Sequence, residues 1–297
     1  MSETAGAAAL PVRWAVADGL LEVTIDHPPV NALSHAVRVG LMHAAELLDS
    51  TASLQAMILR STGPVFIGGA DIREFGGPRL EPLLTAVCDR LEQCQKPVVA
   101  ALQGAALGGG LEVALAAHVR VAAPGVEVAF PEVLLGLLPG AGGTQRAPRL
   151  CGAARALALM LTGTRLGATA AQEAGLLDVL HDDPVSHARV VALQLIESGA
   201  PLPRARDGGA LCDRDAQRTA IATAAAQLPD EDAYRLAREQ IIRCVRAAVE
   251  QPYAAGAAVE AEAFHTCLGS PQREQLVNEF FAQRAARKAV ARTAADR

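Results

Sequence analysis

The sequence predicts an α/β fold followed by a helical C-terminal region. Short apolar runs that suit buried strands alternate with longer helical patterns over residues 1–198. The segment 97–117 fits a strand, a glycine-rich loop and a helix in direct succession. From residue 153 onward the pattern is mainly helical. We therefore expect the loops at the strand ends of the first part to gather around one pocket.

The N-terminal half contains the predicted strands. Residues 13–26 fit a hairpin, because Asp18-Gly19 suits a tight turn and apolar residues alternate with polar ones after it. Ser34 is a candidate helix cap, and a glycine-containing loop is expected at 63–69. Further strands are expected at 56–59, 119–122 and 126–130, and helices at 34–49 and 79–95.

The C-terminal half is predicted to be helical in two parts. Asp183-Pro184 provides a cap and a first-turn proline for a helix that ends near Ser198. Residues 199–230 are rich in proline and glycine, which indicates a linker. The expected helices are 153–161, 168–174, 184–198, 231–250, 253–268 and 271–290. This gives a catalytic core at 1–198, a linker at 199–230 and a helical extension at 231–297.

The composition is that of a packed globular protein and argues against a nucleic-acid partner. Hydrophobic residues make up 51% of the chain and charged residues 20%, whereas aromatic residues make up only 3%. The net charge is −5, and no run of five like charges occurs. Neither a base-stacking surface nor a phosphate-binding track is therefore expected, and the ligand should be a small molecule.

Nothing in the sequence predicts a membrane segment or a secretory signal. The start lacks a basic region followed by an apolar one, so we expect a cytoplasmic protein with its six scattered cysteines reduced. The stretch 97–117 holds a single charge and resembles a membrane helix in composition. Its glycines, however, would each cost roughly 1 kcal/mol in a continuous helix, and Val98-Val99 suits a strand.

Two isolated glutamates are the candidates for acid/base chemistry. Glu112 is the only ionisable side chain over 97–117, and Glu132 is the only one over 128–145. A carboxylate in apolar surroundings loses hydration, so its pKa should rise toward neutrality, where it can give and take protons. The alternative is that each glutamate lies on the solvent side of an amphipathic helix. Their positions beside glycine clusters favour a functional pair.

The glycine triplet 108–110 predicts an anion-binding helix N-terminus, because the first backbone N–H groups of a helix have no intrahelical partner. The missing Lys and Ser/Thr argue against a phosphate loop, and the glycine spacing does not fit a dinucleotide fingerprint. An oxyanion hole is the better use, with a second N–H from 66–72, although that segment also fits an ordinary tight loop. No metal site is predicted, since the histidines show no ligand spacing.

Three blocks of residues resemble the enoyl-coenzyme A (CoA) hydratase/isomerase family, also called the crotonase family. They are Phe66-Ile67-Gly68-Gly69-Ala70-Asp71-Ile72, then Gly108-Gly109-Gly110-Leu111-Glu112, then Pro131-Glu132-Val133 with Pro139 through Arg146. The resemblance covers about residues 12–180, and the two glutamates are 20 positions apart, as in the hydratases of this family. The helical remainder is similar to the corresponding part of peroxisomal-type multifunctional β-oxidation enzymes.

The resemblance implies a spiral of ββα repeats and a role for each site residue. The N–H groups of Gly68 and Gly109 would hold the thioester carbonyl. Glu112 would position and deprotonate water, while Glu132 would deliver a proton to the α-carbon, or alone shuttle a proton in double-bond isomerisation. The residues that would line the CoA pocket are Gly68, Gly69, Ala70, Asp71 and Ile72. CoA would be part of the substrate, so no separate cofactor is expected.

The resemblance also bears on partners. The substrate would be an acyl-CoA thioester, and the assembly either a homotrimer or hexamer, as in many family members, or a monomer. The multifunctional relatives continue into a hydroxyacyl-CoA dehydrogenase that these residues do not contain, so dehydrogenase activity is not expected and a separate dehydrogenase becomes a candidate partner. The alternative function is a non-catalytic acyl-CoA-binding or scaffold protein for such a dehydrogenase.

Overall fold

A computed structural model describes residues 10–295 except 72–73, 75–76, 209–212 and 230–231, with side chains as far as Gln283. The chain forms two compact units, each built from two stretches of sequence. The first unit comprises Met1–Val128 and Gly167–Arg204, and the second comprises Ala129–Leu166 and Ala205–Arg297. The units therefore do not follow the predicted division at residue 198.

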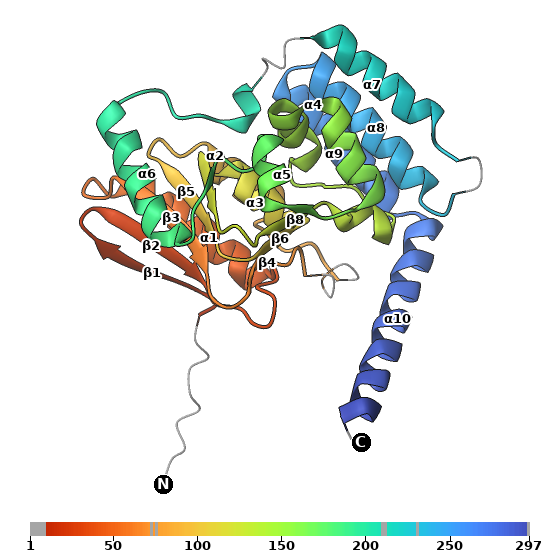
Figure 1. Ribbon diagram of the computed structural model, residues 1–297, viewed down its shortest axis with the longest axis horizontal. Helices are drawn as coiled ribbons and strands as arrows, with labels where there is room; N and C mark the ends of the chain where they lie inside the picture. Colours follow the sequence, from red (N-terminus) through yellow and green to blue (C-terminus); the bar gives the residue numbers. More distant parts are fainter. Residues whose placement is uncertain (1–9, 72–73, 75–76, 209–212, 230–231, 296–297) are drawn as a thin grey trace. The chain divides into compact units, whose positions relative to one another are not determined.

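The first unit contains a six-stranded sheet in the order β1-β2-β3-β5-β7-β10 (Figure 1). Its strands are β1 (Val12–Ala17), β2 (Leu20–Ile25), β3 (Ala56–Ser61), β5 (Val98–Leu102), β7 (Val119–Ala122) and β10 (Val179–Leu180). The β1–β2 pair is antiparallel and all other pairs are parallel. Asp18 and Gly19 have φ values of 51° and 77°, so the predicted hairpin turn is confirmed.

A smaller, four-stranded sheet follows the order β4-β6-β8-β9. Its strands are β4 (Val65–Ile67), β6 (Ala105–Leu107), β8 (Glu127–Ala129) and β9 (Leu166–Gly167). The β4–β6 pair is parallel. Both β4 and β6 lie in segments predicted to be glycine-rich loops, because strands of three residues are too short to show a periodic pattern.

The helices of the first unit are α1 (His35–Ser50), α2 (Leu84–Glu92), α3 (Gly109–Ala116), α5 (Ala168–Glu173) and α6 (Pro184–Ser198). Helix α6 lies beside β3 and β5 (Figure 1), and its Ala188 and Val191 pack into a core with Ile58, Val99 and Val121 of the sheet. Asp183 accepts a hydrogen bond from the Ser186 N–H, which confirms the predicted cap.

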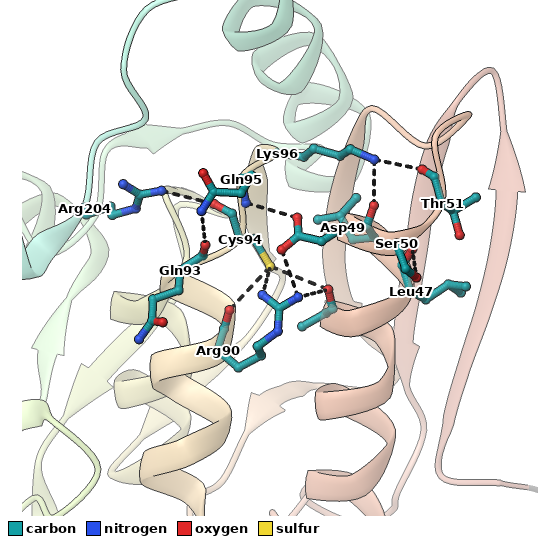
Figure 2. Close-up of polar contacts among 12 residues, drawn as sticks. Leu47, Asp49, Ser50, Thr51, Arg90, Gln93, Cys94, Gln95, Lys96 and Arg204 are labelled. Carbon is teal, nitrogen blue, oxygen red and sulfur yellow. Dashed lines mark hydrogen bonds and ion pairs between the residues drawn. The ribbon is translucent and has the colours of Figure 1, made fainter.

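Helix α1 is capped at both ends by side chains from distant residues. Ser34 occupies the N-cap position but makes no capping hydrogen bond; the His35 N–H instead donates to Glu74 at 2.7 Å. At the other end, Lys96 Nζ donates to the carbonyls of Leu48 and Thr51, each at 2.8 Å (Figure 2). These contacts satisfy terminal backbone groups that the helix itself cannot pair.

The second unit is helical and includes the segment predicted to be a linker. Its elements are η2 (Pro131–Leu135), α4 (Gly143–Thr162), η3 (Ala205–Asp207), α7 (Arg214–Ala226), α8 (Arg235–Glu250), α9 (Tyr253–Leu268) and α10 (Pro271–Ala295). Helix α7 packs against α4 and α8. The interpretation of 199–230 as a linker therefore misses a packed helix, since its proline and glycine residues flank α7 without entering it.

Helix α4 begins inside the glycine-rich segment and is held there by a buried carboxylate. Glu260 of α9 is only 2% exposed and accepts hydrogen bonds from the Gly142 N–H at 2.7 Å, the Thr144 N–H at 3.0 Å and the Thr144 hydroxyl. Gly142 is the N-cap of α4, so this carboxylate lies at the positive end of the helix dipole. A charge on one helix thus fixes the start of another.

One buried histidine makes the stability of the first unit depend on pH. His118 is 1% exposed, and its Nδ1 accepts a hydrogen bond from the Val98 N–H at 2.9 Å. Burial, followed by the nearby Arg204 charge, lowers the pKa of His118 to about 4 from 6.5. The unfolded chain therefore binds the proton more readily between these two pH values, and stability falls as the pH drops through this window.

We expect His118→Asn to remove this pH dependence. The amide oxygen of the introduced side chain can still accept from the Val98 N–H, but it does not titrate. Relative to wild type, the free energy of unfolding of the variant should lose about 3 kcal/mol less between pH 6.5 and pH 4, from the lowering of the His118 pKa to about 4. Urea unfolding at a series of pH values measures this, and parallel pH profiles for the two proteins would contradict it.

Candidate active site

The N-terminus of α3 presents a backbone amide next to close-packed main chain. Gly108 has a φ of 53° and precedes Gly109, the first helical residue, whose N–H has no acceptor within the helix. A Cβ on Gly110 would lie 2.2 Å from the carbonyl oxygen of Ile67, so only glycine fits there. A Cβ on Gly109 would lie 3.4 Å from the backbone nitrogen of Ala70. The triplet therefore brings α3 against the segment that follows β4.

Glu112 lies one turn into the same helix and is buried. Its side chain is in the first turn of α3, and the residue is only 3% exposed. The alternative of a solvent-facing glutamate is therefore wrong for this residue. Residues three apart share a helix face, which places Glu112 above the Gly109 end of α3. A buried glutamate and a helix-terminal amide thus lie in the first turn of one helix, and their joint role in catalysis stays a prediction.

The Gly68 amide is already used by the protein. Its N–H donates to the carbonyl oxygen of Val30 at 2.8 Å. A backbone N–H makes one good hydrogen bond, so the expectation that Gly68 holds a thioester oxygen does not fit this structure. The φ of 115° at Gly69 interrupts the regular extended backbone before Ala70, whose nitrogen is the one near Gly109. Ala70 replaces Gly68 as the candidate donor.

The remaining residues assigned to the CoA pocket follow β4 in sequence. Ala70 is exposed and Asp71 is buried, with 8% of its surface accessible. Leu33 pairs with this segment, since its N–H donates to the Gly69 carbonyl at 2.9 Å. Ile72 lies outside the described residues. A contact of this loop with the adenine of CoA stays a prediction.

Glu132 belongs to the second unit. It is the second residue of η2, follows Pro131 and is half-buried. Its carbonyl accepts hydrogen bonds from the N–H groups of Gly136 and Leu137, and Gly136 closes the turn with a φ of 68°. The two candidate carboxylates thus come from different units of the chain. Their action on one substrate stays a prediction.

Ala70 was expected only as a residue of the CoA pocket, and neither its role as a donor nor the loop that supports it was predicted. Val30, Asn31 and Leu33 are hydrogen-bonded to residues in β4 or close to its ends, and none of the three was a predicted site residue. Asparagine tolerates left-handed backbone, and Asn31, two residues after the Pro28-Pro29 pair, is a signal that could have found the turn. Within the described residues, no group of three or more His, Cys, Asp and Glu could hold a metal ion, and no helix is long and apolar enough to cross a membrane.

Comparison with known proteins agrees with the resemblance. A model of the family described as enoyl-CoA hydratase/isomerase matches residues 15–205. The peroxisomal bifunctional enzyme of Danio rerio is 40% identical over 268 residues, which are 90% of this chain and 37% of the relative. The Homo sapiens enzyme of the same name is 39% identical over 91% of this chain and 38% of its own length. The chain thus spans less than two-fifths of the length of these relatives.

A solved structure supports the same grouping. The enoyl-CoA hydratase of Mycobacterium tuberculosis is 32% identical, with a TM-score of 0.60 over 78% of this chain and 89% of that one. The mixed α/β architecture with parallel sheets and a helical C-terminal region is crotonase-like, as the sequence predicted. The family model alone matches well over half of the residues. This chain belongs to the enoyl-CoA hydratase/isomerase family.

Proposed function

We propose that the protein is an enoyl-CoA hydratase of fatty acid β-oxidation, which adds water syn across the double bond of trans-2-enoyl-CoA thioesters. The observation that carries the proposal is the buried Glu112 one turn after the amide of Gly109, which as the first residue of α3 has no acceptor within the helix. A thioester bound with its carbonyl at this amide would place its double bond within the range of a nearby base. The name of the similar solved structure, an enoyl-CoA hydratase, supports the same chemistry.

In the proposed mechanism, the amides of Gly109 and Ala70 donate to the thioester oxygen. Negative charge develops on this oxygen as the enolate forms, so the two donors stabilise the transition state by ~3 kcal/mol each. In a preorganised site that excludes water, such donors stabilise the developing charge more than water molecules do in solution. Ala70 lies within the segment from Gly68 to Asp71. We assign the CoA adenine pocket to this segment.

The two glutamates divide the proton transfers. Glu112 removes a proton from water while the water oxygen bonds to the β-carbon, and the electrons of the double bond move onto the thioester. Glu132 donates its proton to the α-carbon, which restores the carbonyl and completes 3-hydroxyacyl-CoA. Glu132 alone can move a proton between the α- and γ-carbons, which gives Δ3,Δ2-enoyl-CoA isomerisation as a second activity.

Loss of the conjugated enoyl absorbance tests the proposal directly. Purified protein should convert crotonyl-CoA and longer trans-2-enoyl-CoA substrates to products heavier by one water, identified by mass spectrometry. A trans-3-enoyl-CoA should in turn gain the conjugated absorbance. Tight binding of these thioesters without turnover would overturn the proposal and favour the alternative of an acyl-CoA-binding scaffold.

We also propose how the product is used. A 3-hydroxyacyl-CoA is consumed by oxidation of its hydroxyl group, so the candidate partner is a separate hydroxyacyl-CoA dehydrogenase. This chain alone should form no NADH from 3-hydroxybutyryl-CoA and NAD, and addition of a dehydrogenase should restore it. The cytoplasm is the proposed location, whereas the bifunctional relatives carry names that place those proteins in peroxisomes.

A further inference from the structure

We propose that Asn31 is a positioning residue that fixes the Ala70 amide for the reaction. The inference rests on the proposed function and assigns to Asn31 a role that acts through the Ala70 amide. Asn31 is 3% exposed and has a φ of 51°, in the left-handed region where asparagine is tolerated better than most residues. Its backbone therefore forms a sharp, buried turn.

The side chain of Asn31 joins two loops of the first unit. Its Oδ1 accepts from the His27 N–H at 2.8 Å, which closes its own turn. Its Nδ2 donates to the carbonyls of Thr62 and Val65, each at 2.8 Å. Thr62 directly follows β3 and Val65 is the first residue of β4. The amide group thus locks the 27–33 loop to the start of the strand that leads to Ala70.

The backbone on both sides of Asn31 then holds the residues just before Ala70. Val30 accepts from the Gly68 N–H at 2.8 Å, and the Leu33 N–H donates to Gly69 at 2.9 Å. Leu33 and Ala70 form a parallel bridge. A Cβ on Gly109 would also lie 3.1 Å from the Leu33 side chain, so the same loop contacts both proposed donor residues.

This arrangement predicts an effect on turnover and not on binding alone. An oxyanion donor must lie close to its ideal position, because a displacement of about 1 Å can cost on the order of a hundredfold in rate. The donors interact more strongly with the enolate than with the bound thioester. Loss of the Asn31 contacts should therefore lower kcat while KM changes little.

The experiment compares wild type, Asn31→Gly and Lys96→Met. Asn31→Gly permits the left-handed backbone but removes the three side-chain hydrogen bonds. We expect kcat for crotonyl-CoA hydration to fall by about ten- to a hundredfold with KM within about threefold. Lys96→Met removes two hydrogen bonds to carbonyls elsewhere in the same unit (Figure 2) and should leave kcat at the wild-type value.

A spectroscopic measurement separates positioning from general loss of structure. The absorbance of bound 4-dimethylaminocinnamoyl-CoA moves to longer wavelength as its carbonyl is polarised. This shift should shrink in Asn31→Gly and persist in Lys96→Met. A wild-type shift and kcat in folded Asn31→Gly would overturn the inference and leave the proposed function standing. A wild-type protein with neither turnover nor shift would overturn both.

A second variant covers the case in which Asn31→Gly does not fold. Asn31→Asp keeps the acceptor for His27 but replaces the two donors by a carboxylate that faces the Thr62 and Val65 carbonyls. Protonation of this carboxylate restores one donor, so its kcat relative to wild type should rise as the pH is lowered. A ratio that does not change with pH would contradict the positioning role.

Discussion

Replacement of either proposed catalytic glutamate by glutamine should lower kcat for crotonyl-CoA hydration by about 10²–10⁴-fold. The amide keeps the size and most hydrogen bonds of the carboxylate but cannot take up or release the proton. Enoyl absorbance measures the rate, and thermal unfolding checks that Glu112→Gln and Glu132→Gln are folded. Glu197→Gln is the control, because Glu197 is an exposed glutamate of α6.

The two variants should also differ from each other. Since isomerisation requires only Glu132, Glu112→Gln should retain conversion of trans-3-enoyl-CoA, whereas Glu132→Gln should lose both activities. The double variant should hydrate little more slowly than the worse single one, because the two residues act in one step. Near-normal hydration by purified Glu132→Gln would refute the acid/base pair.

Loss of the buried Glu260 carboxylate should give the largest loss of stability in the second unit. Glu260→Ala leaves the Gly142 and Thr144 N–H groups buried without an acceptor, at a cost on the order of 4 kcal/mol. Urea unfolding followed by circular dichroism measures the change. Glu262→Ala on the same helix is the matched control.

The control isolates the effect of burial. Glu262 pairs with Arg243, but its side chain is 66% exposed, so its loss should cost less than about 1 kcal/mol. Glu260→Gln should fall between the two, since its amide oxygen accepts but its NH₂ group meets further donors. Equal stability of Glu260→Ala and Glu262→Ala would show that the carboxylate does not hold the start of α4.

Local signals predicted much of the fold correctly. The β1–β2 turn, the Asp183 cap and the start of α10 at residue 271 each depend on neighbouring residues, and the structure has all three. The prediction that Ser34 caps α1 was wrong in detail, because the capping side chain is that of Glu74, which lies 39 positions from His35. The start of α4 was missed for the same reason, since Glu260 lies more than a hundred positions away.

In the candidate site, too, features that depend on neighbouring residues were predicted, and features that depend on distant residues were not. Burial of Glu112 followed from the absence of other charges around it, and the helix-terminal amide followed from the glycine triplet. The choice between Gly68 and Ala70 could not be made in that way, because it depends on a hydrogen bond to Val30, on a loop almost forty residues earlier. The pairing of Glu112 with Glu132 rests on the family pattern and stays a prediction.

Each of the two units is built from two separate stretches of the chain, and this limits where the protein can be truncated. The chain passes from one unit to the other after Val128, after Leu166 and after Arg204. Helix α4 therefore precedes α5 and α6 in the sequence, while its packing partners α8 and α9 follow them. A protein truncated at residue 198 would lack α8 and α9, which pack against α4. The surface of α4 that they cover would then be exposed and prone to aggregation. Residues 205–297 thus belong to the fold of the second unit and are not an accessory tail.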